Sequence, residues 1–92
     1  MGASLGTWRL PPHFPAMPRY FFNVRNIDPS IDDLGEELPD NEAAWHEATR
    51  FAGELFKDID GRFRPGESWS LEVTDKDGRP IFRIQIQSQN VT

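Results

Sequence analysis

The middle of the chain carries one long helical pattern. Between residues 41 and 60, apolar side chains recur at steps of three and four, which places them on one face of a helix. They are Ala44, Trp45, Ala48, Phe51, Ala52, Leu55, Phe56 and Ile59. Asp40 is suited to cap the first turn, and Gly61 is suited to the left-handed conformation that ends many helices. A single helix of this kind needs another layer to cover its apolar face.

Segments on both sides of this helix alternate between apolar and polar residues, as strands with one buried face do. They span residues 19–25, 68–74 and 81–87, and a short further strand is expected within residues 31–38. Asp75 to Gly78 has the composition of a tight hairpin connection. The sequence therefore predicts an α+β fold of order ββαββ, with one antiparallel four-stranded sheet and a single helix packed on one face.

The domain limits follow from the loss of both periodicities near the N-terminus. Residues 1–16 mix Gly, Ser and Pro with isolated apolar residues, and Met17 opens the first patterned segment. We expect residues 1–16 to be a flexible leader, and a second interpretation is that they lie upstream of a natural start at Met17. Residues 17–92 are predicted to form a single domain, because a chain of 92 residues buries only one core.

Composition excludes several classes of protein. The absence of cysteine removes disulfides, thiolate nucleophiles and Cys-ligated zinc, and we expect a reducing cytoplasm. The net charge of −5 makes nucleic-acid binding unfavourable unless the few arginines cluster. No apolar run approaches the roughly 20 residues that span a bilayer, so we predict no association with a membrane.

The zinc and nucleophile motifs are incomplete. His46 and Glu47 form half of an HExxH pattern, but Arg50 stands where the second histidine ligand belongs and cannot bind a metal. His46 is instead expected on the exposed helical face beside Glu42 and Arg50. No serine lies in an activating elbow, so we predict that the protein is not an enzyme.

Two acidic segments resemble calcium loops without completing them. A loop that starts at Asp28 has Asp33 in place of the required glycine and Pro39 in place of the bidentate glutamate. A loop that starts at Phe56 has an apolar residue at its first ligand position. We therefore predict neither a metal nor a cofactor.

Three spaced motifs indicate a family. They are the opening segment MPRYFF at Met17, a DxxGxELPD segment that ends at Asp40, and LEVTDxxG, which ends at Gly78. Together they resemble a small bacterial family known only as a domain of unknown function, over residues 17 to about 88. The resemblance implies a one-helix α+β fold in the cytoplasm, and it supplies no activity, ligand or catalytic residue. The chain departs from it at Asn23, where many relatives are expected to carry histidine.

The sheet face away from the helix, here called the helix-free face, is the candidate interaction site. We expect it to be polar and slightly basic, with one aromatic side chain. The candidate residues are Arg19, Phe21, Asn23, Arg25, Arg83 and Gln85, together with Ser70, Glu72, Thr74 and Gln87.

Three functions fit these expectations. The leading hypothesis is a non-enzymatic protein-interaction or regulatory module, with homodimerisation as one form, that uses this face or an open sheet edge. The alternative is a single-stranded nucleic-acid binder that stacks a base on Phe21 and places phosphates at the arginines. The third is an enzyme whose site the sequence does not reveal.

Overall fold

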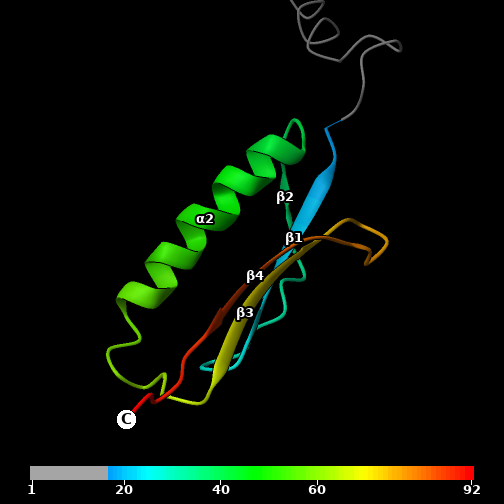
Figure 1. Cartoon of the computed structure of the whole chain (residues 1–92). Helices are drawn as coiled ribbons and strands as arrows, with labels where there is room; N and C mark the ends of the chain where they lie inside the picture. The colour runs from blue at the N-terminus through cyan, green and yellow to red at the C-terminus, as the bar shows by residue number, and fades with distance from the viewer. Residues whose placement is uncertain (1–16) are drawn as a thin grey trace, which may run out of the picture.

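The computed structural model describes residues 17–92, which form one sheet and one helix (Figure 1). In chain order the elements are β1 (Arg19–Arg25), β2 (Glu36–Glu37), α2 (Asn41–Lys57), β3 (Ser68–Thr74) and β4 (Pro80–Gln87). The predicted α+β fold of order ββαββ is confirmed. The predicted leader, residues 1–16, lies outside the described residues.

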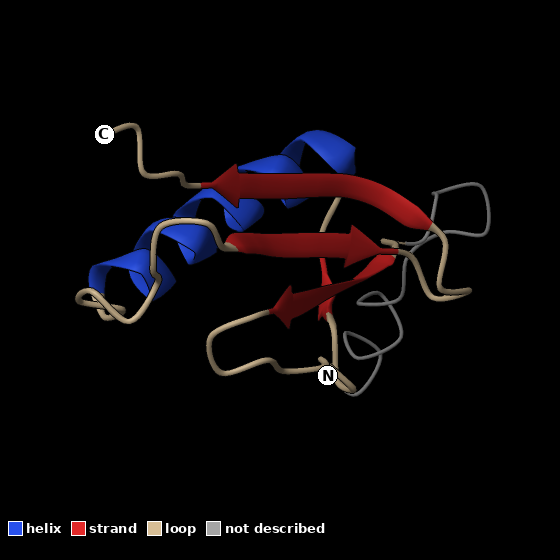
Figure 2. Ribbon diagram, turned by 60° about the horizontal axis from the view of Figure 1, so that its bottom comes forward, coloured by secondary structure: helices blue, strands red, loops and turns tan. Residues whose placement is uncertain are grey.

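The sheet is antiparallel throughout, with the strand order β2-β1-β3-β4 (Figure 2). The central pair, β1 and β3, joins segments on opposite sides of the helix in the sequence. Val24 lies opposite Leu71, and Leu71 lies opposite Ile84. Directly opposed residues share one face of a sheet, so the apolar positions of three strands form continuous rows.

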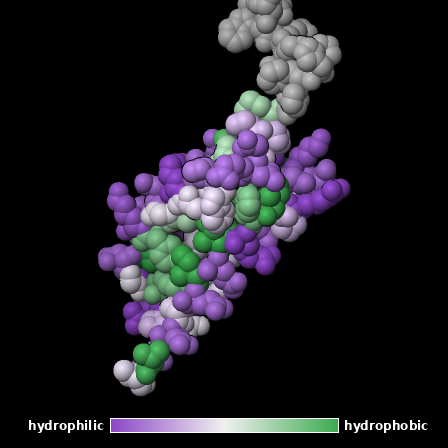
Figure 3. All heavy atoms as spheres, turned by 45° about the horizontal axis from the view of Figure 1, so that its top comes forward, coloured by the Kyte–Doolittle hydropathy of each residue, from purple (hydrophilic) through white to green (hydrophobic). Residues whose placement is uncertain are grey.

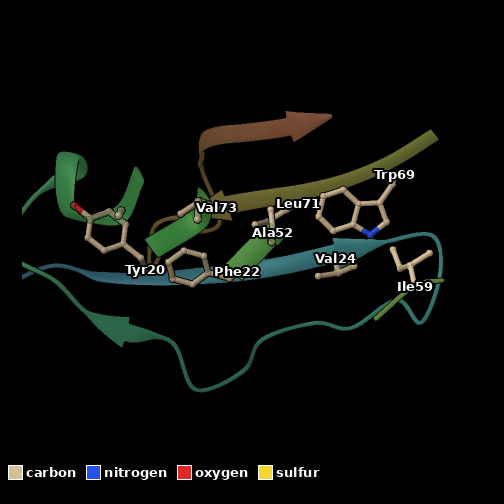
Figure 4. Packing of buried hydrophobic residues seen from close by; sticks show 10 residues of the cluster. Tyr20, Phe22, Val24, Ala52, Ile59, Trp69, Leu71 and Val73 are labelled. Atoms are coloured by element: carbon tan, nitrogen blue, oxygen red, sulfur yellow. The ribbon is translucent and has the colours of Figure 1, made fainter. Parts of the chain in front are cut away.

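The core lies between these rows and α2 (Figure 4). Its buried residues are Tyr20, Phe22, Val24, Ala44, Ala48, Ala52, Ile59, Trp69, Leu71 and Val73. Alanines form the buried centre of the helix, so its backbone lies close to large side chains such as Trp69, which is 1% exposed. The Tyr20 hydroxyl donates a hydrogen bond to Asn41 Oδ1 at 2.7 Å and ties β1 to the start of the helix.

The helix begins where the sequence predicts and ends earlier. Asp40 caps it by accepting a hydrogen bond from the Ala43 N–H at 2.9 Å. The predicted end at Asp60 is wrong, because α2 ends at Lys57. The N–H groups of Asp58 and Ile59 donate to carbonyls three residues back, which tightens the last turn. Asp60 and Gly61 then take φ values of +48° and +84° and turn the chain away.

The second predicted strand is reduced to two residues, although the chain follows β1 for much longer. Leu38 N–H donates to Pro18 O at 3.1 Å, and Val24 exchanges hydrogen bonds of 2.9 and 3.1 Å with Ser30. Between these points the Asp32 carboxylate accepts a hydrogen bond from the Phe22 N–H at 3.2 Å. A side chain thus replaces the strand backbone at this position, and regular pairing stops there.

Gly35 occupies a position that other residues fit poorly. Its φ is +73°, and an added Cβ would lie 2.9 Å from Tyr20 O and 2.8 Å from Phe21 Cε2. The segment before β2 therefore approaches β1 more closely than a side chain allows.

We predict that Gly35→Ala lowers the free energy of unfolding by about 1–3 kcal/mol, from backbone strain and this contact. The matched control is Gly53→Ala in α2, where an added Cβ meets nothing within 4 Å. Gly53→Ala should raise stability by roughly 0.5–1 kcal/mol through its helix propensity. Urea unfolding measures both variants, and equal effects would contradict the close approach at Gly35.

Candidate functional site

The predicted helix-free face exists as two rows of side chains across the three long strands. Asn23, Glu72 and Arg83 form one row, because Glu72 lies opposite both of the others in the strand register. Arg25, Ser70 and Gln85 form the next row. Thr74, also expected on this face, is buried beside Phe21. The structure thus brings together the predicted residues of β1 and β4 across β3.

Two of the three arginines on this face form ion pairs with carboxylates of the same chain. Arg83 donates from Nε to Glu72 Oε2 at 3.1 Å, and a second guanidinium nitrogen bonds the same oxygen. Arg19 bonds Glu37 Oε2 at 3.2 Å and the Leu34 carbonyl at 2.6 Å. Within residues 17–92, Arg25 forms no ion pair. The face is therefore close to neutral, and Arg25 supplies its one uncompensated positive charge.

Phe21 is the aromatic residue that the sequence places on this face, and the structure covers part of it. The side chain is half-buried, and Gly35 lies against its ring edge and against Arg19. In the same loop as Gly35, Ile31 and Leu34 are 84% and 78% exposed. The loop before β2 thus covers part of the Phe21 ring, and its own aliphatic side chains are exposed.

Asn23 and Asp32 hold this loop against β1. Asn23 Oδ1 accepts a hydrogen bond from the Asp32 N–H at 2.8 Å. The Asp32 carboxylate accepts bonds from the N–H groups of Phe22, Leu34 and Gly35 at 3.2, 3.1 and 3.0 Å. Partial burial by itself raises the pKa of Asp32, but these three backbone donors and nearby Arg19 together hold it below its usual value.

The opposite edge of the sheet is β4. The hydrogen bonds of β1 show which way the backbone groups of β4 point. Val24 exchanges both of its backbone bonds with Ser30, so its N–H and C=O point away from β3. Backbone groups alternate in direction along an antiparallel strand. Odd-numbered residues of β1 therefore bond even-numbered residues of β3, which leaves the odd-numbered residues of β3 to bond β4.

Because odd-numbered residues of β3 lie opposite even-numbered residues of β4, β4 bonds to β3 through its even-numbered residues. The Ser88 N–H donates to Glu67 O at 3.2 Å, so the same pattern of even-numbered residues bonding odd-numbered ones continues beyond the strand. The backbone groups of Arg83, Gln85 and Gln87 consequently point away from the sheet, and we call this row the β4 edge. No other strand within residues 17–92 pairs with it. The sheet thus ends in a row of unpaired donors and acceptors.

An incompletely covered apolar row runs beside the β4 edge. Phe82, Ile84 and Ile86 face the core, yet all three are only half-buried. Trp45 packs on Phe82 with ring centroids 5.3 Å apart and remains 38% exposed. Figure 3 shows apolar side chains reaching the surface between hydrophilic ones. The apolar surface of the core therefore extends to the open edge of the sheet.

A groove of about 380 Å³ lies between α2 and the loop before β2. Phe22 and Phe51, packed edge to face with centroids 6.4 Å apart, contribute its aromatic lining. The charged residues around it are Asp32, Glu36, Glu47 and Arg50. Arg50 bonds Glu47 through Nε at 3.2 Å, and this carboxylate raises the pKa of Arg50. The lining thus presents no unpaired cation to an anionic ligand.

His46 and two acidic segments are the sequence candidates for metal binding or catalysis. His46 lies on the exposed face of α2, 3.1 Å from Glu42, as predicted. Across residues 17–92, no group of three or more His, Cys, Asp or Glu side chains is placed to hold a metal ion. In the same range, no helix is long and apolar enough to cross a membrane.

The sequence missed two features of the site. The role of Asp32 depends on contacts with residues 10 and 9 positions away, Phe22 and Asn23. Strand order, which decides that β4 is at the edge, is likewise absent from the periodicity. The end of β4 alternates between Ile and Gln, and the strand has only one charged residue. Because charged residues usually protect edge strands, this pattern is the sequence feature that indicates an unprotected edge.

Comparison with known proteins identifies one family. A model described as a domain of unknown function matches residues 19–87, which is most of the chain. No curated protein and no solved structure matches significantly.

The hydrogen bonds of Asp32 predict a pH-dependent contribution to stability. Asp32→Asn should lower the free energy of unfolding by about 1–3 kcal/mol at pH 7, because an amide cannot accept at all three N–H groups. A folded pKa below the unfolded value contributes stability that is complete above the unfolded pKa and is lost as the pH falls through the folded pKa. The difference between wild type and Asp32→Asn should therefore shrink below about pH 4.

The matched control for this experiment is Asp33→Asn at the neighbouring exposed residue, whose side chain forms no hydrogen bond within residues 17–92. Urea unfolding at a series of pH values measures all three proteins. An equal loss in the two variants at pH 7 would show that the loop does not depend on the Asp32 carboxylate.

Proposed function

Because the chain belongs to the DUF6894 family, a domain of unknown function, we propose its function from the structure: a non-enzymatic protein-interaction module. In this proposal the β4 edge binds an extended segment of a partner protein by strand addition. The observation that supports it is the row of outward backbone groups along one side of the sheet. We further propose that the protein acts in the bacterial cytoplasm, as its cysteine-free sequence and its resemblance to a bacterial family led us to expect.

The backbone of β4 supplies the first part of the argument. An added strand bonds the N–H and C=O groups of Arg83, Gln85 and Gln87 and forms a fifth strand. β4 has 8 residues, and its one proline, Pro80, is at the first position. Natural edge strands are usually protected by charge, bulges or proline. Here Arg83 is the one charged residue of the strand, and Glu72 pairs with it.

The apolar row supplies the second part. Phe82, Ile84 and Ile86 lie on the same side of the sheet as α2 and are half-buried. Alternate side chains of an added strand would lie beside them, with Trp45 above. Covering exposed apolar area contributes about 25 cal/mol per Å². The edge thus combines directional hydrogen bonds with an apolar contact.

The helix-free face is less suited to a ligand, because most of its polar groups have internal partners. Arg19 and Arg83 bond carboxylates, and Asn23 bonds the loop. A single-stranded nucleic acid would have to displace these pairs, and it would bind a chain of net charge −5. Nucleic-acid binding therefore remains an outcome of the test below.

A proline scan tests the proposed function. We predict that peptides of the length of β4, selected from a displayed library with alternating apolar positions, shift the amide resonances of Arg83, Gln85 and Gln87. Gln85→Pro should weaken their binding about tenfold or more, since it removes one outward N–H and no bond to β3. Titration followed by nuclear magnetic resonance measures both effects.

Gln85→Ala is the matched control, because it removes the same side chain and keeps the N–H group. Equal binding by the proline and alanine variants would overturn strand addition. Resonance shifts confined to the helix-free face would do the same. Salt-dependent binding of single-stranded RNA that Arg25→Glu abolishes would favour the nucleic-acid alternative.

A further inference from the structure

We infer that the β4 edge binds a second copy of itself, so that two chains form one continuous eight-stranded sheet about a twofold axis. This inference rests on the proposed function and names its partner. In a twofold antiparallel pair, the edge strand lies beside a copy of itself that runs in the opposite direction. Its side chains must therefore be compatible with those of the reversed copy. The sequence PIFRIQIQ of β4 meets this requirement in one register.

The direction of the backbone groups restricts the possible registers. In an antiparallel pair, residues that point toward the partner exchange both hydrogen bonds with each other. These are the odd-numbered residues of β4, so twofold pairing has to place odd residues opposite odd ones. Registers centred on Arg83, Ile84 or Gln85 satisfy this condition. In each of them α2 of both chains lies on the same face of the joined sheet.

Charge repulsion disfavours the register centred on Arg83. Pairing centred on Arg83 puts the two Arg83 side chains directly opposite each other, which destabilises a strand pair. Pairing centred on Ile84 places each Arg83 opposite the partner's Gln85. Each guanidinium then keeps its bond to Glu72 and lies beside a neutral amide.

Length and apolar contact favour the register centred on Ile84 over that centred on Gln85. It pairs the whole stretch from Ile81 to Gln87. In the register centred on Gln85, Phe82 would lie opposite the partner's Ser88, which is beyond the end of β4 at Gln87. On the side of the helices, Ile84 lies opposite its own copy and Phe82 lies opposite the partner's Ile86. The half-buried apolar row of each chain therefore covers the same row of the other.

Sedimentation equilibrium of the full chain tests the inference. We expect wild type to dimerise and Gln85→Ala to dimerise with a similar dissociation constant. Gln85→Pro should raise that constant about tenfold or more. It removes the Gln85 N–H, which in this register donates to the partner's Arg83 carbonyl, and the twofold axis makes this loss occur twice per dimer. Circular dichroism and thermal unfolding establish that each variant is folded. A wild-type protein that stays monomeric up to about 1 mM overturns the inference.

Disulfide formation tests the register without proline. The chain has no cysteine, so a single introduced cysteine gives an unambiguous crosslink. In the register centred on Ile84, the two residues 84 form a non-hydrogen-bonded pair with Cα atoms about 4.5 Å apart, which a disulfide spans. Ile84→Cys should crosslink under mild oxidation. Gln85→Cys, whose copies lie roughly 7–8 Å apart, should crosslink far less.

These experiments separate failure of the inference from failure of the proposed function. Preferential crosslinking of Gln85→Cys would overturn the register centred on Ile84. A monomeric wild type that binds library peptides at the β4 edge, with loss in Gln85→Pro, would overturn self-pairing and leave strand addition standing. A monomeric wild type that binds none of them would overturn both.

Discussion

One carboxylate closes one edge of the sheet, and the rest of the structure depends on it. Asp32 accepts hydrogen bonds from β1 and from its own loop, and it stands where a strand would offer a carbonyl. β1 is thereby covered from Pro18 to Val24, although β2 contains only two residues. Because β1 is paired on both sides, it is an interior strand that supports Tyr20, Phe22 and Val24 in the core.

Closing that edge leaves the other one as the part of the backbone open to a partner. The fold has four strands and one helix, so no further element within residues 17–92 covers β4. The alanines of α2 bring the helix close to the sheet, but one helix does not cover the full width of the apolar rows. The outermost row, Phe82 to Ile86, stays half-buried for this reason. Unpaired backbone groups and apolar side chains therefore lie along the same edge.

The helix-free face has a different character from this edge. Its charged groups are paired across strands: Glu72 forms an ion pair with Arg83, and Glu37 forms one with Arg19. Exposed ion pairs such as Arg19–Glu37 add little stability, with a median of about 0–1 kcal/mol. They do keep the face close to neutral. A surface whose charges are internally matched has less to offer a charged ligand than an edge whose hydrogen-bonding groups have no internal partner.

The sequence by itself determined the elements and their faces, because hydrophobic periodicity is a local property. It predicted β1 and β3 at their observed limits, the Asp40 cap and the exposed position of His46. It placed the end of α2 three residues too late, since the apolar periodicity continues to Ile59 while the N–H groups of Asp58 and Ile59 already bond carbonyls three residues back. Only the tertiary structure decided that Asp32 completes an edge, that Arg19 and Arg83 are paired with carboxylates and that β4 is outermost. Those features depend on strand order and on contacts between distant residues, which no local pattern records.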